Sequence, residues 1–132
     1  MTPQQLRKFV AAIPFNRLVG LRLARLHPDG VTVECDLRPN LMNGAGVLHG
    51  GVTATLADVA VGIALTRHIG RPRAGTTVEL KVNYLRPVSN GRIRARARLL
   101  RVGKTLCTGR VDLHDSEQQL FGTALATYML LP

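Results

Sequence analysis

An acid and a pair of glycines in one apolar stretch are the residues of this chain best suited to chemistry. The stretch 43–68 reads NGAGVLHGGVTATLADVAVGIALTRH, and Asp58 is its only acid. His49, Gly50 and Gly51 come just before the apolar part, where glycines let a ligand approach the N-terminus of a helix closely. A carboxylate in an apolar element, together with an anion-attracting helix N-terminus, predicts an active site.

One long helix must position these residues. Val52, Leu56, Val59 and Ile63 form an apolar stripe, and alanines, valines and a leucine fill most of the other sides. Such a helix is typical of a protein core, because no side of it suits water. The longest apolar run within it, 59–65, is too short to span a bilayer.

The rest of the chain predicts a short opening helix and several strands. Residues 2–12 have helical spacing and Pro14 ends that helix, so 16–26 is expected to be a loop that enters a first strand. Strict alternation over 31–38 predicts a strand before the long helix. Four more strands are expected after it, at 76–85, 92–102, 106–113 and 120–130. Turn residues between these four predict a hairpin meander, and hairpins require an antiparallel sheet.

Length and composition narrow the class of protein. We expect a single α+β domain over 1–132, with a short N-terminal helix at 1–14 and a curled antiparallel sheet wrapped around the central helix. No opening stretch resembles a signal peptide, so we expect a cytoplasmic protein without a membrane partner. Cys35 and Cys107 are expected to be buried free thiols. The net charge of +10 favours an anionic partner, although few aromatic residues are present to stack on bases.

Several motifs together resemble a known family. The first is Asn43-x-x-Gly46-x-x-His49-Gly50-Gly51 followed by Leu56-Ala57-Asp58, and the stretches 75–87 and Gly103-Lys104-Thr105 also fit. They are similar to the hotdog-fold acyl-CoA thioesterases, and within these to the phenylacetate-degradation and thioesterase-superfamily-member type. The resemblance implies the hotdog fold and hydrolysis of the thioester of a short- or medium-chain or aryl acyl-CoA to a free acid and CoA. Coenzyme A is then part of the substrate, and neither a separate cofactor nor a metal is expected.

The resemblance also implies roles for individual residues. The Gly50 N–H and the Asn43 side chain would polarise the thioester carbonyl, where a backbone donor stabilises the developing negative charge. Asp58 would act as general base or nucleophile, and Thr77 would help to place the water. His49 would contact the carbonyl or coenzyme, or else orient the loop. Contacts with coenzyme A are implied for Tyr84, Leu85, Arg86, Pro87, Arg101, Val102, Gly103 and Lys104.

The spacing of Asp58 and Gly50 predicts a site shared between subunits. Asp58 lies eight residues after Gly50, which is roughly 12 Å along a helix axis. One carboxylate and one water span about half of that distance. We therefore expect a homodimer, or a tetramer built as a dimer of dimers, in which antiparallel helices bring Asp58 of one chain near Gly50 of the other. The family's inter-subunit sites agree with this expectation.

Other interpretations remain open at this point. Asp58 could pair with an arginine, Asn43 could be a turn residue, and Thr77 could be an ordinary strand residue. The domain could bind acyl-CoA without hydrolysing it, or be a hydratase of the same fold; nucleic-acid binding is the weakest alternative. The alternating arginines of the strand 92–102 could form a solvated outer face or a phosphate site. They are Arg92, Arg94, Arg96 and Arg98.

Overall fold

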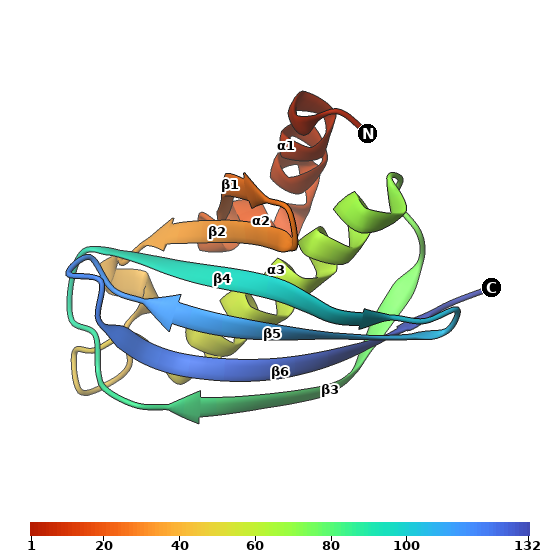
Figure 1. Cartoon of the computed structure of the whole chain (residues 1–132). Coiled ribbons are helices and arrows are strands. Elements are labelled where there is room, and N and C mark those ends of the chain that lie inside the picture. The colour runs from red at the N-terminus through yellow and green to blue at the C-terminus, as the bar shows by residue number, and fades with distance from the viewer.

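A computed structural model describes all residues, 1–132, as one sheet packed on one long helix. The helix is α3 (Gly50–Ile69), and Figure 1 shows it lying across one face of the sheet. The six strands are antiparallel, in the order β1-β2-β4-β5-β6-β3. Their bounds are β1 (Arg22–His27), β2 (Gly30–Asp36), β3 (Gly75–Tyr84), β4 (Arg92–Val102), β5 (Leu106–His114) and β6 (Leu120–Leu130). The predicted α+β fold is confirmed.

The predicted four-strand meander is wrong for β3. Strands β4, β5 and β6 follow one another as hairpins, but β3 pairs with β6, at the opposite side from β4. The segment 85–91 therefore crosses between two separate parts of the sheet instead of closing a hairpin. This order makes β3 an edge strand, and it places Thr77 of β3 opposite Tyr128 of β6.

The N-terminal region contains two helices, where the sequence predicted one helix and a loop. The first, α1 (Pro3–Ala12), begins with a capping box between Thr2 and Gln5. Pro14 ends α1 as expected, but it also starts α2 (Pro14–Val19), because proline suits the first position of a helix. The buried side chain of Asn16 donates to the Val10 carbonyl at 3.0 Å and holds the two helices together.

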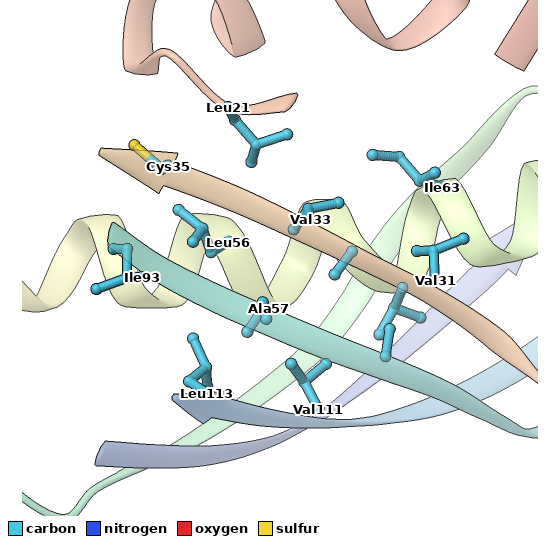
Figure 2. Close-up of a cluster of buried hydrophobic side chains, with 14 of the residues drawn as sticks. Leu21, Val31, Val33, Cys35, Leu56, Ala57, Ile63, Ile93, Val111 and Leu113 are labelled. Carbon is cyan, nitrogen blue, oxygen red and sulfur yellow. The ribbon is translucent and has the colours of Figure 1, made fainter. Parts of the chain in front are cut away.

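The main core lies between α3 and the inner face of the sheet. Figure 2 shows Leu56 and Ala57 of α3 among side chains of β2, β4 and β5. Alternate residues of these strands are fully buried, as the period of two predicted: Val31, Val33, Cys35, Ile93, Ala95, Ala97, Val111 and Leu113. Both cysteines are buried and unpaired, as expected.

Within this chain α3 is buried on one side only, which corrects the prediction of a helix buried all round. Eight of its twenty residues are buried. A half-buried stripe with helical spacing runs along the side of α3 that meets Thr77 of β3 and Tyr128 of β6, and we call it the open flank: Thr55, Asp58, Val59, Gly62, Thr66 and Ile69. By length and composition α3 could also cross a membrane, contrary to the estimate from its longest apolar run. Its packing against the sheet instead makes it a core helix.

Candidate active site

Asp58 lies on the open flank, and one of its two carboxylate oxygens is firmly held. Thr77 donates its hydroxyl to Asp58 Oδ1 at 2.7 Å. The hydroxyl of Tyr128 lies 2.9 Å from the same oxygen and 2.7 Å from the backbone carbonyl of Asp58. Oδ2 accepts no hydrogen bond from the chain. Two strands of the sheet therefore orient the carboxylate and leave one oxygen available.

Tyr128 is a site residue that the sequence did not suggest. Burial raises the pKa of its hydroxyl, so the group stays protonated and acts as a hydrogen-bond donor. The ring crosses α3 at Gly62, where a Cβ would lie 2.9 Å from the hydroxyl oxygen. Glycine is needed there for this close approach. A lone glycine inside a long helix was the available signal, since it often marks a packing requirement.

A second cluster surrounds the N-terminus of α3. His49 is the N-cap residue, and its Nδ1 accepts the Gly51 N–H at 2.8 Å. The neutral ring then carries its proton on Nε2. Gly50 is the first residue of the helix, and its N–H donates to no group of the chain. Its carbonyl accepts the Tyr84 hydroxyl at 2.8 Å. The arrangement leaves one backbone N–H free at the positive end of a helix.

A cavity of about 390 Å³ joins this N-terminus to the segment that follows β3. Asn43, Gly50, Tyr84, Leu85, Arg86 and Pro87 are among its lining residues, so the structure brings these predicted residues together. The Asn43 Oδ1 accepts the N–H groups of Ala45 and Val47, at 2.9 and 3.3 Å. Asn43 therefore shapes its own turn, while its Nδ2 makes no hydrogen bond within the chain. Arg86 donates to the side chain of Gln119.

The other predicted coenzyme contacts lie at the opposite end of the sheet. Residues 103–105 connect β4 to β5, and a Cβ at Gly103 would lie 2.7 Å from the Leu106 carbonyl oxygen, so the turn needs glycine. Val102 pairs with Cys107, Cys107 with Tyr128, and Tyr128 with Thr77. This places the hairpin in line with the Asp58 cluster. Arg101 and Val102 also line a cavity of about 590 Å³ at the C-terminal end of α3.

The two clusters are separate within one chain. Thr77, which holds Asp58, and Tyr84, which holds Gly50, are seven residues apart on β3. At about 3.3 Å per residue this is a separation of roughly 23 Å. The direct spacing of Asp58 and Gly50 along α3 is roughly 12 Å. One chain therefore presents two incomplete halves of the predicted site.

The alternating arginines of β4 form the outer face of the sheet, and each has an acidic partner there. Arg92 donates to Asp36 at 3.0 Å and Arg94 to Glu34 at 3.1 Å. Arg96 and Arg98 pair with Asp29 and Asp112. Burial alone would raise the pKa of Glu34, but hydrogen bonds from Arg94 and Arg22 outweigh it and hold that pKa below its usual value. These pairs favour the solvated outer face over a phosphate site.

Comparison with protein families and curated proteins identifies relatives of this chain. The model of the thioesterase superfamily matches residues 45–122, a range that contains Gly50, Asp58 and Thr77. The medium/long-chain acyl-CoA thioesterase YigI of Escherichia coli strain K12 is 36 % identical over 137 residues. That alignment covers 92 % of this chain and 88 % of YigI.

Solved structures show the same architecture. PA5202 of Pseudomonas aeruginosa is 28 % identical, with a TM-score of 0.86 over 98 % of this chain and 100 % of that one. A variant of the phenylacetic acid degradation protein PaaI from Thermus thermophilus is 25 % identical, with a TM-score of 0.80. This second match covers 89 % of this chain and 97 % of PaaI.

Proposed function

The chain belongs to the thioesterase superfamily, and from this premise we propose that it hydrolyses acyl-CoA thioesters at a site shared by two protomers. Its fold is the hotdog fold that the sequence resemblance implied. The relative YigI acts on medium- and long-chain acyl-CoA, and we extend this substrate class to the present chain. Each product pair is then a fatty acid and free coenzyme A.

The observation that carries the proposal is that only one of the two Asp58 carboxylate oxygens accepts hydrogen bonds from the chain. Thr77 and Tyr128 hold Oδ1, so the side chain has one orientation and Oδ2 has no hydrogen-bond partner within the chain. As a general base, Oδ2 takes a proton from the water that attacks the thioester carbonyl. As a nucleophile, the same oxygen forms an acyl-enzyme that water then opens. In either case the C–S bond breaks and the coenzyme leaves as a thiol after taking a proton.

The N-terminus of α3 supplies the complementary half. Negative charge develops on the carbonyl oxygen as the thioester is attacked, and preorganised donors stabilise it without rearrangement. The free N–H of Gly50 is such a donor, at the positive end of a twenty-residue helix. The Nδ2 of Asn43 is a second donor that lines the same cavity. His49 caps the helix and so orients the Gly50 N–H. A domain that only binds acyl-CoA needs neither a free N–H there nor a free carboxylate oxygen.

The edge strand β3 can pair two protomers, and this pairing would bring the two halves of the site together. Its outer edge is unpaired, and Val78 on it is 50 % exposed, which an isolated sheet does not favour. Antiparallel pairing of β3 with its copy about a two-fold axis would set the Thr77 end of one strand beside the Tyr84 end of the other. Asp58 of one protomer then approaches Gly50 of its partner. A homodimer or a dimer of dimers contains this unit.

The same pairing reunites the residues proposed to bind coenzyme A. The hairpin with Arg101 and Lys104 lies at the Thr77 end of its own sheet, and the segment Tyr84–Pro87 lies at the other end. In the antiparallel dimer the hairpin of one protomer and Tyr84–Pro87 of the other share one end. The cations Arg86, Arg101 and Lys104 then flank a single groove for the phosphates.

Mixing two inactive variants tests this proposal. Asp58→Asn removes the carboxylate, and Gly50→Pro removes the N–H donor. Proline suits the first position of a helix, and the extended backbone of His49 (ψ 131°) suits a residue that precedes proline. Gly50→Ala is the matched control, since it keeps the N–H and adds the Cβ that meets the Tyr84 ring at 3.3 Å. Release of coenzyme A thiol from dodecanoyl-CoA measures the activity.

Each variant alone should lose activity by about 10²- to 10³-fold. When the two are unfolded together in equal amounts and refolded, half of the dimers are mixed, and each mixed dimer has one intact site. About a quarter of the parent activity should return. No recovery, with mixed dimers demonstrated by differential tags, would show that Asp58 and Gly50 act within one chain. Parent enzyme without thioesterase activity on any acyl-CoA would reject the function itself.

The proposed cytoplasmic location is supported by the state of the cysteines. Cys35 and Cys107 are buried, unpaired and far apart in the sheet order, on β2 and β5. Burial raises the pKa of the Cys35 thiol, which keeps it in the unreactive protonated form. Such thiols are typical of proteins from a reducing compartment.

A further inference from the structure

An apolar cavity of about 310 Å³ lies beside the open flank of α3, apart from the cavity at the helix N-terminus. Phe9, Ile13 and Phe15 of the N-terminal helices form one wall, and Val59 and Thr66 of the open flank belong to another. Tyr128 and Leu130 of β6 close it from the sheet side. In Figure 1 the N-terminal helices lie beyond the β1 edge of the sheet, on the same side as the C-terminal half of α3.

The cavity is adjacent to the Asp58 carboxylate through Tyr128 and Val59. Tyr128 belongs to both places, because its hydroxyl contacts Asp58 and its ring lines the cavity. Val59 follows Asp58 in the chain, and Gly62 and Thr66 continue the same side of the helix toward its C-terminus. At 1.5 Å per residue, Thr66 stands about 12 Å along the axis from Asp58. An acyl chain whose carbonyl lies at Asp58 is therefore within reach of this lining along one side of the helix.

The chemistry of the lining favours an aliphatic occupant. Nine of its fourteen residues are hydrophobic. Its polar side chains already donate within the protein: Asn16 to Val10, Thr66 to Gly62, Arg73 to Leu131 and Tyr128 to Asp58. No buried side-chain nitrogen or oxygen is left without a partner. A polar acyl group would find few donors here, whereas methylene groups would replace water against apolar walls.

The volume of the cavity indicates the length of the acyl chain that it can hold. A methylene group is close in size to a water molecule, whose share of liquid volume is about 30 Å³, so the cavity holds roughly ten methylene groups. Resting on the proposed thioesterase function, we propose that this cavity binds the acyl chain of the substrate and that the N-terminal helices α1 and α2 limit its length. The chain's own N-terminal region is then a specificity element, with Ile13 and Thr66 on opposite walls as the residues that measure the acyl group.

Two substitutions that fill the cavity from opposite walls test this inference. Thr66→Phe fills it from α3 and Ile13→Phe from the N-terminal helices. Leu18→Phe is the matched control, because Leu18 lies on α2 but is 70 % exposed and outside the cavity. The values of kcat/KM for butanoyl-CoA and dodecanoyl-CoA give a selectivity ratio for each protein. We expect both filling variants to lower the dodecanoyl-to-butanoyl ratio by about tenfold or more, while Leu18→Phe keeps the parent ratio.

Binding provides a second readout that does not depend on turnover. The Kd of a non-hydrolysable dodecyl thioether of coenzyme A should rise in both filling variants relative to a butyl thioether, and circular dichroism verifies that each variant is folded. If the filling variants change the Kd of the dodecyl and butyl thioethers equally, or change neither, the inference is overturned. The acyl chain would then bind elsewhere, and the partner protomer could cover this cavity. A parent protein that binds the thioethers by length but releases no thiol would retain the acyl site and reject the proposed thioesterase function.

Discussion

On the outer face of the sheet, the four alternating arginines of β4 each lie next to a carboxylate of the same chain. The pKa values of Asp36 and Asp29 are held below their usual range by hydrogen bonds from Arg92 and Arg96. The open flank of α3 differs. There Asp58 has one oxygen without a partner, and no arginine or lysine of the chain forms an ion pair with it.

The difference between the two surfaces separates polar groups that stabilise the fold from polar groups that are free to bind a ligand. Charges on the outer face satisfy one another within a single chain, so their geometry needs no ligand and no second subunit. The flank holds its carboxylate by two neutral hydroxyls and leaves one oxygen without a partner beside an apolar cavity. At the N-terminus of the same helix, the backbone N–H of Gly50 is also without a partner. Unused hydrogen-bonding capacity next to an apolar cavity indicates a place where a substrate completes the structure.

The largest predicted difference in kcat is between two variants that each neutralise one acid, on the open flank and on the outer face. Asp58→Asn should lower kcat by about 10³-fold, because neither proton abstraction nor attack is possible from an amide. Asp36→Asn, which changes the charge equally on the outer face, should leave kcat within about twofold of the parent, since surface pairs contribute little. Thiol release under substrate saturation measures both. A loss of similar size in the two variants would mean that overall charge, and not the open flank, controls turnover.

A smaller effect is expected for the hydroxyl that orients Asp58. Tyr128→Phe removes a donor to the carboxylate and should lower kcat by about tenfold, since a hydrogen bond to a charged group is worth about 1.5 to 3 kcal/mol. The donor fixes the orientation of the carboxylate, so its removal lets the attacking oxygen leave its position. The Kd of the non-hydrolysable dodecyl thioether should stay near the parent value, because the aromatic ring that lines the cavity is kept. In the parent protein the Tyr128 hydroxyl should add no basic limb to the kcat/KM profile, because burial raises its pKa and keeps it protonated across the working range.

A purely structural role for Tyr128 predicts a different result. The variant would then weaken binding of the thioether as much as it lowers kcat, and its melting temperature would fall in parallel. Thr77→Val removes the other donor to Oδ1 at nearly constant volume. If both hydroxyls orient the carboxylate, this variant should also lower kcat while the Kd of the thioether stays near the parent value.

The sequence predicted the parts of the site that depend on local pattern. The buried side of α3, the alternation along β4 and the helix N-terminus at Gly50 all follow from spacing within a few residues. The open flank could not be predicted, because the apolar residues of α3 look alike whether they face the sheet or a substrate cavity. Val59 and Val61 are such a pair, half-buried and buried.

Long-range pairing accounts for the other errors. The meander was expected because turn residues separate all the later strands, yet β3 and β4 have different neighbours in the sheet. Tyr128 was missed for the same reason, since only the pairing of β6 with β3 sets it beside Thr77 and Asp58. Pro14 ends α1, as the sequence predicts, and it is also the first residue of α2. In each case local chemistry allowed two outcomes, and contacts distant in sequence decided between them.

The smallest predicted effect is a change in KM when cations without an ion-pair partner are removed. Arg101 and Lys104 form no ion pair in the chain, unlike Arg92 and Arg94 on the outer face. If the hairpin binds the phosphates of coenzyme A, Arg101→Ala/Lys104→Ala should raise KM by roughly tenfold, at about 0.5 to 1 kcal/mol for each contact. The value of kcat should hold, because these groups contact parts of the substrate that keep their charge during the reaction. High salt should reproduce the effect in the parent protein by screening.

The control removes the same amount of charge from the other surface. Arg92→Ala/Arg94→Ala should leave KM close to the parent value, because those guanidinium groups are already engaged by Glu34 and Asp36. A truncated pantetheine thioester, which lacks the nucleotide phosphates, should be hydrolysed equally well by all three proteins. If the hairpin variant loses as much on this short substrate as on the full thioester, Arg101 and Lys104 shape the turn after β4 instead of binding phosphate. If the two double variants raise KM equally on the full thioester, the net charge of +10 attracts the substrate as a whole and neither surface is a specific coenzyme site.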